Sequence, residues 1–333
     1  MQLDYSIVIC TYNPDEDLFT RCLKAVERLD KESLKIEILL MDNNSTKPID
    51  ALGCVKSLLK NESNSKLILV KEQGLTHARV AGIEAAKGKN IVFFDDDNEP
   101  DSNYLQELKR LNAIHEHVAA WGPGIVNVDF TGGIDKALEG FARAAFQQRE
   151  TDYIAYSNLR SWQECYPFGT GLSVRTDLLT SYISMLKTGV FSMTDRKGNS
   201  MSSGGDTQMV LFFVKSGFAA GVSPGLKMVH IVPCKRANFQ YLQRLSYGTY
   251  LCYSQLQVEV FPEKFDTISK YLISEGRFTK KVLTNFVKFW FRPNPVKQLA
   301  FTNYIAANCG EYNVVGKTIP KSVQWVIKKL NLS

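Results

Sequence analysis

Three consecutive aspartates, Asp95, Asp96 and Asp97, directly follow the apolar run IVFF. Carboxylates this close repel one another unless a cation or solvent compensates their charge. Magnesium or manganese supplies such compensation, because these ions prefer oxygen ligands and complete their shell with phosphate oxygens and water. If the run is extended, Asp95 and Asp97 share a face. The aspartates indicate either a divalent metal site or a solvated acidic loop that caps a helix starting near Asp101.

Two further polar residues stand in positions suited to ligand binding. Asp42, in MDNNST, either accepts a hydrogen bond from a nucleobase or forms an Asx-turn or helix cap. Arg79 lies on a helix otherwise lined by alanines. It forms either a surface salt bridge or the charge compensation for the acidic strand end.

His230 and Asp206 are the candidates for metal binding and proton transfer. His230 stands in the apolar stretch KMVHIVP, where a hydrogen-bonded core histidine is the alternative to a ligand. Asp206 follows the polar stretch RKGNSMSSGG and begins a predicted helix. Asp206 is therefore either the N-cap of that helix or a general base at the rim of a crevice.

Apolar strands and helices alternate through the first part of the chain. We expect strands over 5–11, 36–41, 66–70 and 90–94, and helices over 18–29, 52–59 and 76–87. This alternation predicts an α/β fold with a mostly parallel sheet flanked by helices. Because ligands bind at the carboxyl ends of such strands, Thr11, Asp42 and Asp95 should reach one crevice.

The alternation weakens after residue 126. We expect a strand over 118–126, an inserted helix within 132–149, a strand over 171–175, a polar flexible loop over 196–205, a helix over 206–215 and a strand over 226–232. The loop could close over a bound ligand and exclude water. From residue 239 the pattern is helical, with breaks at Pro262, at Pro293 to Pro295 and at Pro320.

Composition excludes several classes of protein. With 333 residues, 44% hydrophobic and 22% charged, the chain should fold into one large domain plus an appendage, or into two domains. Its seven cysteines form no CxxC pair and no zinc spacing, which favours a reducing cytoplasm. A secretory leader and a membrane span are both disfavoured, since no basic leader and no apolar run of about 20 residues occur.

Taken together, these residues resemble the family 2 glycosyltransferases, the inverting, nucleotide-sugar-dependent enzymes of the GT-A (Rossmann-like) fold. The resemblance lies in SIVICTYNP, LLMDNNST, EQGLTHARVAGIEAAKGKNIVFFDDDNEP, PFGTGLSVR, GGDTQM and HIVPCKR, which span about residues 5–236. Its longest block runs from Gly74 to Pro100. It implies a GT-A domain over 1–236, with a nucleotide-binding half over about 1–130 and an acceptor half over about 131–236, followed by a helical region over 237–333.

The resemblance also implies a role for each candidate residue. Thr11, Tyr12 and Asp42 would hold the base, Asp95 or Asp96 the ribose, and Asp97, supported by His230, a Mn²⁺ or Mg²⁺ ion under the diphosphate. Asp206 matches the catalytic aspartate, although Gly205 stands where the family usually has Glu or Asp. Arg79, Arg236 and Arg244 are further candidates for contacts with the donor.

These roles imply an enzyme that moves a sugar from a nucleotide diphosphate, with UDP favoured, to a hydroxyl of a glycan or lipid-linked acceptor in surface polysaccharide synthesis. A nucleotidyltransferase and a non-catalytic nucleotide-sugar binding protein are the alternatives. A nucleotidyltransferase would show a Gly-rich basic loop after the first strand, and CTYNPDED lacks one. Nucleic acid is not expected as a partner, because residues 1–130 lack interleaved basic and aromatic readout motifs.

The C-terminal region is basic and aromatic. The net charge of the chain is +6, and residues 277–333 carry ten Lys and Arg against the single acidic residue Glu311. NFVKFWFRPNPVKQLAF suits an interfacial segment that meets anionic lipid, and an ordinary helical subdomain that packs its aromatics inward is the alternative. The expected location is the cytoplasm, with peripheral contact at the inner face of the cell membrane if the first interpretation holds.

Overall fold

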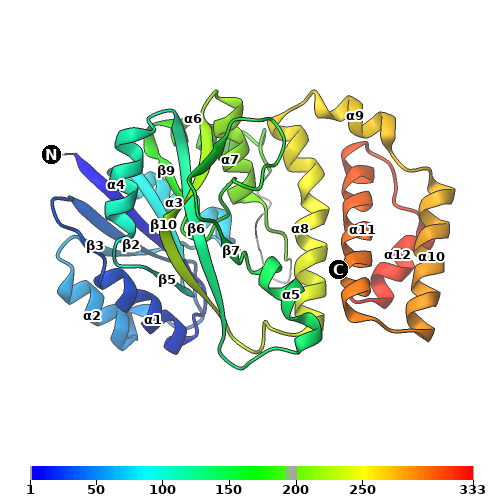
Figure 1. Ribbon diagram of the computed structural model, residues 1–333, viewed down its shortest axis with the longest axis horizontal. Coiled ribbons are helices and arrows are strands. Elements are labelled where there is room, and N and C mark those ends of the chain that lie inside the picture. Colours follow the sequence, from blue (N-terminus) through cyan, green and yellow to red (C-terminus); the bar gives the residue numbers. More distant parts are fainter. Residues whose placement is uncertain (1, 193–194, 196–200, 333) are drawn as a thin grey trace.

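The computed structural model describes residues 2–192, 195 and 201–332 and shows a mixed α/β fold (Figure 1). One sheet runs through the described part of the chain in the order β3-β2-β1-β4-β9-β6-β10-β5, with β7 paired to β6 and β8 to β10. Helices cover both faces of this sheet. The expected α/β class is therefore confirmed.

The first half of the sheet is parallel. Its strands are β1 (Leu3–Thr11), β2 (Ile36–Asp42), β3 (Ser65–Leu69) and β4 (Gly88–Asp95), and the helices between them are α1 (Glu16–Glu27), α2 (Gly53–Asn61) and α3 (Leu75–Ala85), with a short 3-10 turn η1 (Ile49–Ala51). Each of the strands and helices expected here from the apolar pattern is present. Thr11 and Asp42 lie opposite each other where β1 and β2 end.

The second half combines a long parallel pair with short antiparallel strands. β6 (Val118–Phe130) and β10 (Ala219–Val232) run parallel, while β5 (Asn98–Pro100), β7 (Arg149–Glu150), β8 (Ala155–Ser157) and β9 (Ser173–Arg175) pair antiparallel to their neighbours. β10 begins earlier than expected, and β9 begins later. The strands β5, β7 and β8 escaped the sequence analysis because two or three residues show no measurable alternation.

Alternation along the central strands builds the core on both faces. In β1, Val8 and Cys10 pack on one face with α3, whereas Ile7 and Ile9 pack on the other with α1. The first face is also covered by α6 (Leu179–Lys187, after the 3-10 turn η2, Thr176–Leu178), α7 (Gly205–Lys215) and α8 (Phe239–Val260); the second by α2 and α4 (Tyr104–Ile114). The period of two residues therefore places the strand ends, and the polar residues that follow them, between two helix layers.

The C-terminal helices form one end of the molecule, beyond α8 (Figure 1). They are α9 (Lys264–Tyr271), α10 (Glu275–Phe291), α11 (Pro295–Val314) and α12 (Lys321–Lys329), while α5 (Lys136–Ala145) packs near the start of α8. The expected breaks at Pro262, Pro293 to Pro295 and Pro320 are present. No helix among the described residues is long and apolar enough to cross a membrane.

Helix α8 belongs to three cores, and its Leu242 and Leu245 pack with α5. Cys252 and Leu256 pack into the core beside α7, whereas Tyr247 packs among the C-terminal helices. At Gly310 of α11, a side chain would meet the backbone oxygen of Leu251 at 2.4 Å, so this glycine permits close contact between the two helices. The boundary expected at residue 236 stays a prediction.

Candidate functional site

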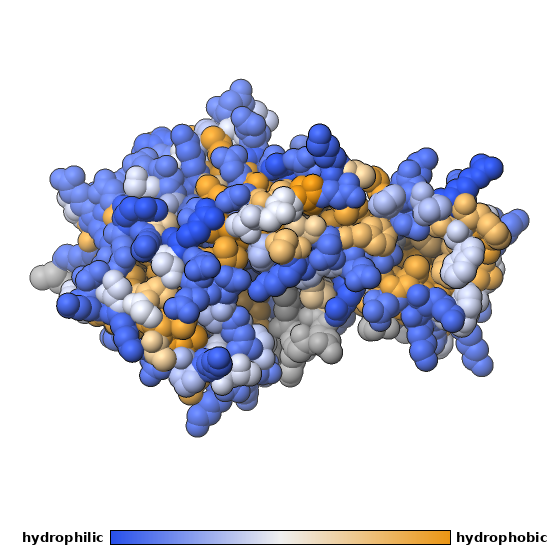
Figure 2. All heavy atoms as spheres, turned by 90° about the horizontal axis from the view of Figure 1, so that it is seen from below, coloured by the Kyte–Doolittle hydropathy of each residue, from blue (hydrophilic) through white to orange (hydrophobic). Residues whose placement is uncertain are grey.

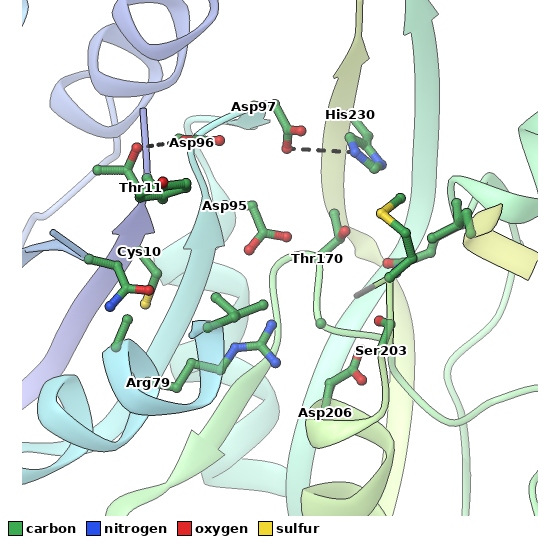
Figure 3. A pocket seen from close by; sticks show the side chains of 18 of the residues that line it. Cys10, Thr11, Arg79, Asp95, Asp96, Asp97, Thr170, Ser203, Asp206 and His230 are labelled. Atoms are coloured by element: carbon green, nitrogen blue, oxygen red, sulfur yellow. Dashed lines mark hydrogen bonds and ion pairs between the residues drawn. The ribbon is translucent and has the colours of Figure 1, made fainter. Parts of the chain in front are cut away.

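A cavity of about 320 Å³ opens at the carboxyl ends of β1 and β4 (Figure 3). Nine of the residues singled out in the sequence line it: Thr11, Tyr12, Arg79, Asp95, Asp96, Asp97, Asp206, His230 and Arg236. They come from elements far apart in the chain, which the parallel sheet brings to one edge. Asp42 and Arg244 are not among the residues that line the cavity.

The three aspartates form a turn and not an extended run. β4 ends at Asp95, whose backbone N–H donates to Asn98 Oδ1 at 3.0 Å. Asp96 accepts a hydrogen bond of 2.5 Å from Thr11 Oγ1. Burial and the neighbouring Asp97 carboxylate raise the pKa of Asp96 to about 7. The turn therefore sends the carboxylates of Asp96 and Asp97 to different partners.

Asp97 is buried and pairs with two cationic or protonatable side chains. Arg236 Nη1 contacts Asp97 Oδ2, and His230 Nε2 lies 3.6 Å from Asp97 Oδ1. Burial alone would raise the pKa of this carboxyl, but His230 and Arg236 lower it well below its ordinary value. Arg236 is itself fixed by Tyr241, whose hydroxyl accepts from Arg236 Nε at 3.1 Å.

His230 is oriented by its second ring nitrogen. His230 Nδ1 lies 2.9 Å from the carbonyl oxygen of Phe146, so Nδ1 carries the proton and donates it. In the neutral ring, Nε2 then presents a lone pair towards Asp97 Oδ1. A backbone carbonyl that fixes the tautomer in this way is the usual support of a metal-binding histidine.

The donor set at Asp97 and His230 fits a divalent cation that has further ligands of its own. Asp97 Oδ1 and His230 Nε2 lie 3.6 Å apart, and both could ligate an ion between them when Nε2 carries no proton. Among the residues the structure describes, no group of three His, Cys, Asp or Glu side chains converges on one point. Phosphate oxygens and water would therefore have to complete the shell, as is common for Mg²⁺.

Strands β1 and β2 supply another wall of the cavity. Asn43 lines it, and its Oδ1 accepts a 2.7 Å hydrogen bond from the backbone N–H of Gly74 at the start of α3. Tyr12 is half exposed, and its hydroxyl accepts from Gln73 at 3.3 Å. Asp42 is buried, and its Oδ1 accepts from the backbone N–H of Ser45 at 2.9 Å.

Asp42 thus makes the turn that the sequence offered as an alternative, and its neighbour Asn43 reaches the cavity. The sequence analysis missed Asn43, although it stands in the same MDNNST segment. Its buried amide ties the end of β2 to the start of α3, since Asn43 Nδ2 also donates to the backbone oxygen of Glu72 at 2.7 Å.

Asp206 faces the cavity from α7. The N-cap of this helix is Gly204, so the N-cap interpretation of Asp206 is wrong. Asp206 Oδ1 accepts from the backbone N–H of Thr207 at 2.8 Å, and the residue is only 7% exposed. A side chain at Gly169 would meet Asp206 Oδ2 at 2.8 Å and Arg79 Nη2 at 2.9 Å. The absence of a side chain at Gly169 therefore leaves room for both Asp206 and Arg79.

Arg79 is not a surface residue. Its guanidinium is buried and pairs with Asp195, with Nη1 3.2 Å from Asp195 Oδ2. Burial alone would lower the pKa of Arg79, but the carboxylates of Asp195, Asp206 and Asp95 raise it above the ordinary value. The surface salt bridge offered by the sequence is therefore wrong, and Arg79 compensates several buried carboxylates. Asp195, which no sequence pattern singled out, is its direct partner.

Two buried polar atoms at the cavity lack a hydrogen-bond partner among the described residues. They are Thr170 Oγ1, on a residue only 2% exposed, and Gln147 Oε1. Figure 3 shows Thr170 between the aspartate turn and His230 on one side and Asp206 on the other. Because an unpaired buried polar atom is costly, these two atoms indicate contact with a polar ligand or with water.

The segment before α7 also reaches the cavity. Met201 and Ser203 line it and pack on α8, where a side chain at Gly248 would meet the backbone oxygen of Met201 at 2.3 Å. Residues 196–200 of the expected flexible loop lie outside the described residues.

The model of the family "Glycosyl transferase family 2" matches residues 6–179, more than half of the chain. Polypeptide N-acetylgalactosaminyltransferase 14 of Homo sapiens is 23% identical over 269 residues, 78% of this chain and 46% of that protein. A GalNAc(5)-diNAcBac-PP-undecaprenol beta-1,3-glucosyltransferase of Campylobacter jejuni is 28% identical over 138 residues, 40% of this chain and 42% of that protein.

A solved structure of GalNAc-T7 with UDP, GalNAc and Mn²⁺ superposes with a TM-score of 0.49 and 15% identity, over 69% of this chain and 43% of that chain. The chain thus spans less than half the length of these relatives.

Proposed function

The chain belongs to glycosyl transferase family 2, and from this membership and the cavity we propose that it transfers a sugar from a nucleotide diphosphate donor, with UDP favoured, to an acceptor hydroxyl with inversion at the anomeric carbon. The acceptor is a glycan or a lipid-linked glycan of surface polysaccharide synthesis. One observation carries the proposal: the Asp97, His230 and Arg236 cluster and the Asp206 carboxylate line the same cavity.

The wall formed by β1, β2 and the start of α3 suits the nucleoside. Tyr12 offers a half-exposed ring for a base, with Thr11 beside it, and Asp96 presents a carboxyl to a ribose. Asp42 is not among the residues that line the cavity, so its role for the base is indirect. It makes the turn beside Asn43. Asn43 holds this wall rigid, because it ties β2 to α3.

The Asp97 cluster suits the diphosphate. Arg236 is planar, charged and fixed by Tyr241, and such a guanidinium binds phosphate oxygens well. Asp97 and His230 would hold a Mn²⁺ or Mg²⁺ ion, which supplies Lewis-acid stabilisation of the departing diphosphate when bound. The neutral Nε2 of His230 and the ionised Asp97 are the protonation states that this role requires.

Asp206 suits the general base. As the acceptor oxygen attacks the anomeric carbon, its proton passes to the Asp206 carboxylate, and the bond from the anomeric carbon to the diphosphate oxygen breaks. No covalent intermediate on the chain is required, so the anomeric configuration inverts. Thr170 and Gln147 have free polar atoms for hydroxyls of the sugar or the acceptor.

The C-terminal helices suit contact with an anionic membrane. Trp290 and Phe291 at the end of α10 are 76% and 77% exposed, and with Trp325 of α12 they form an aromatic patch. Figure 2 shows apolar side chains gathered at this end of the molecule. Lys329 lies over the Trp325 ring, and residues 277–333 carry ten Lys and Arg against the single acidic residue Glu311. Phe278 and Phe301 pack inward, so only part of the aromatic set is available to lipid.

A lipid-linked acceptor accords with this patch, and one relative is named for an undecaprenol-linked glycan. We therefore propose that the enzyme acts from the cytoplasm, at the inner face of the cell membrane.

A screen of nucleotide sugars with and without manganese tests the proposed function. The protein should bind one UDP-sugar in a manganese-dependent manner and transfer its sugar to a lipid-linked glycan, and NMR of the product should show the inverted anomer. Retention of configuration would refute the mechanism, and transfer of a nucleotidyl group would refute the function.

A further inference from the structure

Asp195 stands out because a buried carboxylate, 7% exposed, is used by no step of the proposed mechanism. It precedes α7 and lies against the first turn of that helix. Its Oδ1 accepts hydrogen bonds from the backbone N–H groups of Gly204, at 3.1 Å, and of Gly205, at 2.8 Å. Asp195 therefore caps the helix that carries Asp206, although it stands ten residues before Gly205 in the chain.

The second oxygen of Asp195 contacts α3. Asp195 Oδ2 lies 3.2 Å from Arg79 Nη1 and accepts a 3.3 Å hydrogen bond from Thr76 Oγ1. The Asp195 and Arg79 side chains are 3% and 10% exposed, so this ion pair is scarcely screened by water. One carboxylate thus links the start of α7 to the buried cation of α3.

Gly205 makes this arrangement sterically feasible. A Cβ at position 205 would lie 2.3 Å from Asp195 Oδ2 and 2.9 Å from Asp195 Cγ. The carboxylate of Asp195 therefore occupies the space that a side chain at position 205 would take. An acidic residue at position 205 could occupy this place only if Asp195 were absent.

Arg79 also lies close to Asp206. Arg79 Nη2 and Asp206 Oδ2 are both within 3 Å of the point where a Cβ of Gly169 would lie, at 2.9 and 2.8 Å. If Asp195 lost its charge, Asp206 would be the carboxylate with the largest effect on the pKa of the buried guanidinium. A buried cation paired directly with Asp206 would lower its proton affinity and make it a weaker base.

We propose that Asp195 is a positioning residue for proton transfer: its carboxylate holds Arg79 and the first turn of α7, and so keeps Asp206 directed into the cavity and free to accept a proton. This inference rests on the proposed role of Asp206 as the base. The carboxylate of Asp195 thus takes the place of the side chain that Gly205 lacks.

The test moves the carboxylate from one chain position to the other. Asp195→Asn keeps the size of the side chain and should lower kcat by about 10- to 100-fold, with donor affinity within about 2-fold of wild type. The double variant Asp195→Gly with Gly205→Asp should recover most of kcat. Its matched control, Asp195→Gly with Gly205→Asn, fills the same space without charge and should not.

A crystal structure of Asp195→Asn gives a readout that does not depend on turnover. It should show Arg79 paired with Asp206. Asp195→Asn with wild-type kcat, equal kcat in the two double variants, or failure of both to fold would overturn the inference. Failure of the proposed function looks different, since Asp206→Asn would then stay active or wild type would transfer no sugar.

Discussion

Asp97 and His230 face each other across 3.6 Å, and the carbonyl oxygen of Phe146, 2.9 Å from His230 Nδ1, orients the ring so that Nε2 is the nitrogen nearest the carboxylate. Asp97→Asn removes the negative charge and keeps the shape. We expect manganese-dependent binding of a nucleoside diphosphate to fall below detection by calorimetry, because the ion that would offset the charges of the phosphates and of Asp95 and Asp96 loses its carboxylate ligand. His230→Ala should weaken the same binding less.

Wild-type affinity in Asp97→Asn would contradict the metal role of Asp97, and wild-type affinity in His230→Ala would make His230 a core histidine. A matched control is Asp177→Asn, which removes a carboxylate from an exposed ion pair away from the cavity and should leave binding unchanged.

Gly169→Ala tests the space between Arg79 and Asp206. The added methyl would approach Asp206 Oδ2 to 2.8 Å and Arg79 Nη2 to 2.9 Å, so at least one side chain must move. We expect kcat to fall by at least about 10-fold, while stability changes by about 1–3 kcal/mol. Gly140→Ala is the control, since nothing lies within 4 Å of its added methyl on α5. Equal kcat in both variants would refute the positioning of Asp206 by Gly169.

Thr170→Val tests the unpartnered hydroxyl in the cavity. If Thr170 Oγ1 bonds a hydroxyl of the sugar or acceptor, the valine should lower kcat/KM by about 2- to 10-fold, and Thr170→Ser should retain it. Thr176 also has a buried hydroxyl without a partner among the described residues, but it lies away from this cavity. Steady-state kinetics should therefore show no change in Thr176→Val. An equal effect of both substitutions would remove Thr170 from the site.

The aromatic patch is tested by the pair Trp290→Ser with Phe291→Ser. We expect co-sedimentation with anionic vesicles to fall by about 10-fold or more, and wild-type binding to weaken as salt rises. Tyr271→Ser is the control, because this side chain is 73% exposed on α9, outside the patch. Unchanged sedimentation would refute membrane binding by this patch. If wild type is a dimer and the double variant a monomer, the patch is instead an interface between two copies of the chain.

The apolar pattern was enough to place the parallel half of the sheet, because buried strands and amphipathic helices have distinct periods. It also predicted that Thr11, Asp42 and Asp95 reach one crevice; Thr11 and Asp95 line the cavity, whereas Asp42 does not. The apolar pattern could not predict the contacts of Asn43, Thr170 and Asp195. These depend on side chains meeting across elements far apart in the chain, and no local period encodes such a meeting.

Transfer rates of Asp206→Asn test the central claim most directly. Asparagine keeps the size of the side chain and its carbonyl can still accept from Thr207, so the fold and donor affinity should persist while the proton acceptor is lost. We predict that kcat falls by about 10²- to 10⁴-fold, with donor affinity and melting temperature close to those of wild type. An Asp206→Asn enzyme that transfers sugar at the wild-type rate would show that another residue is the base.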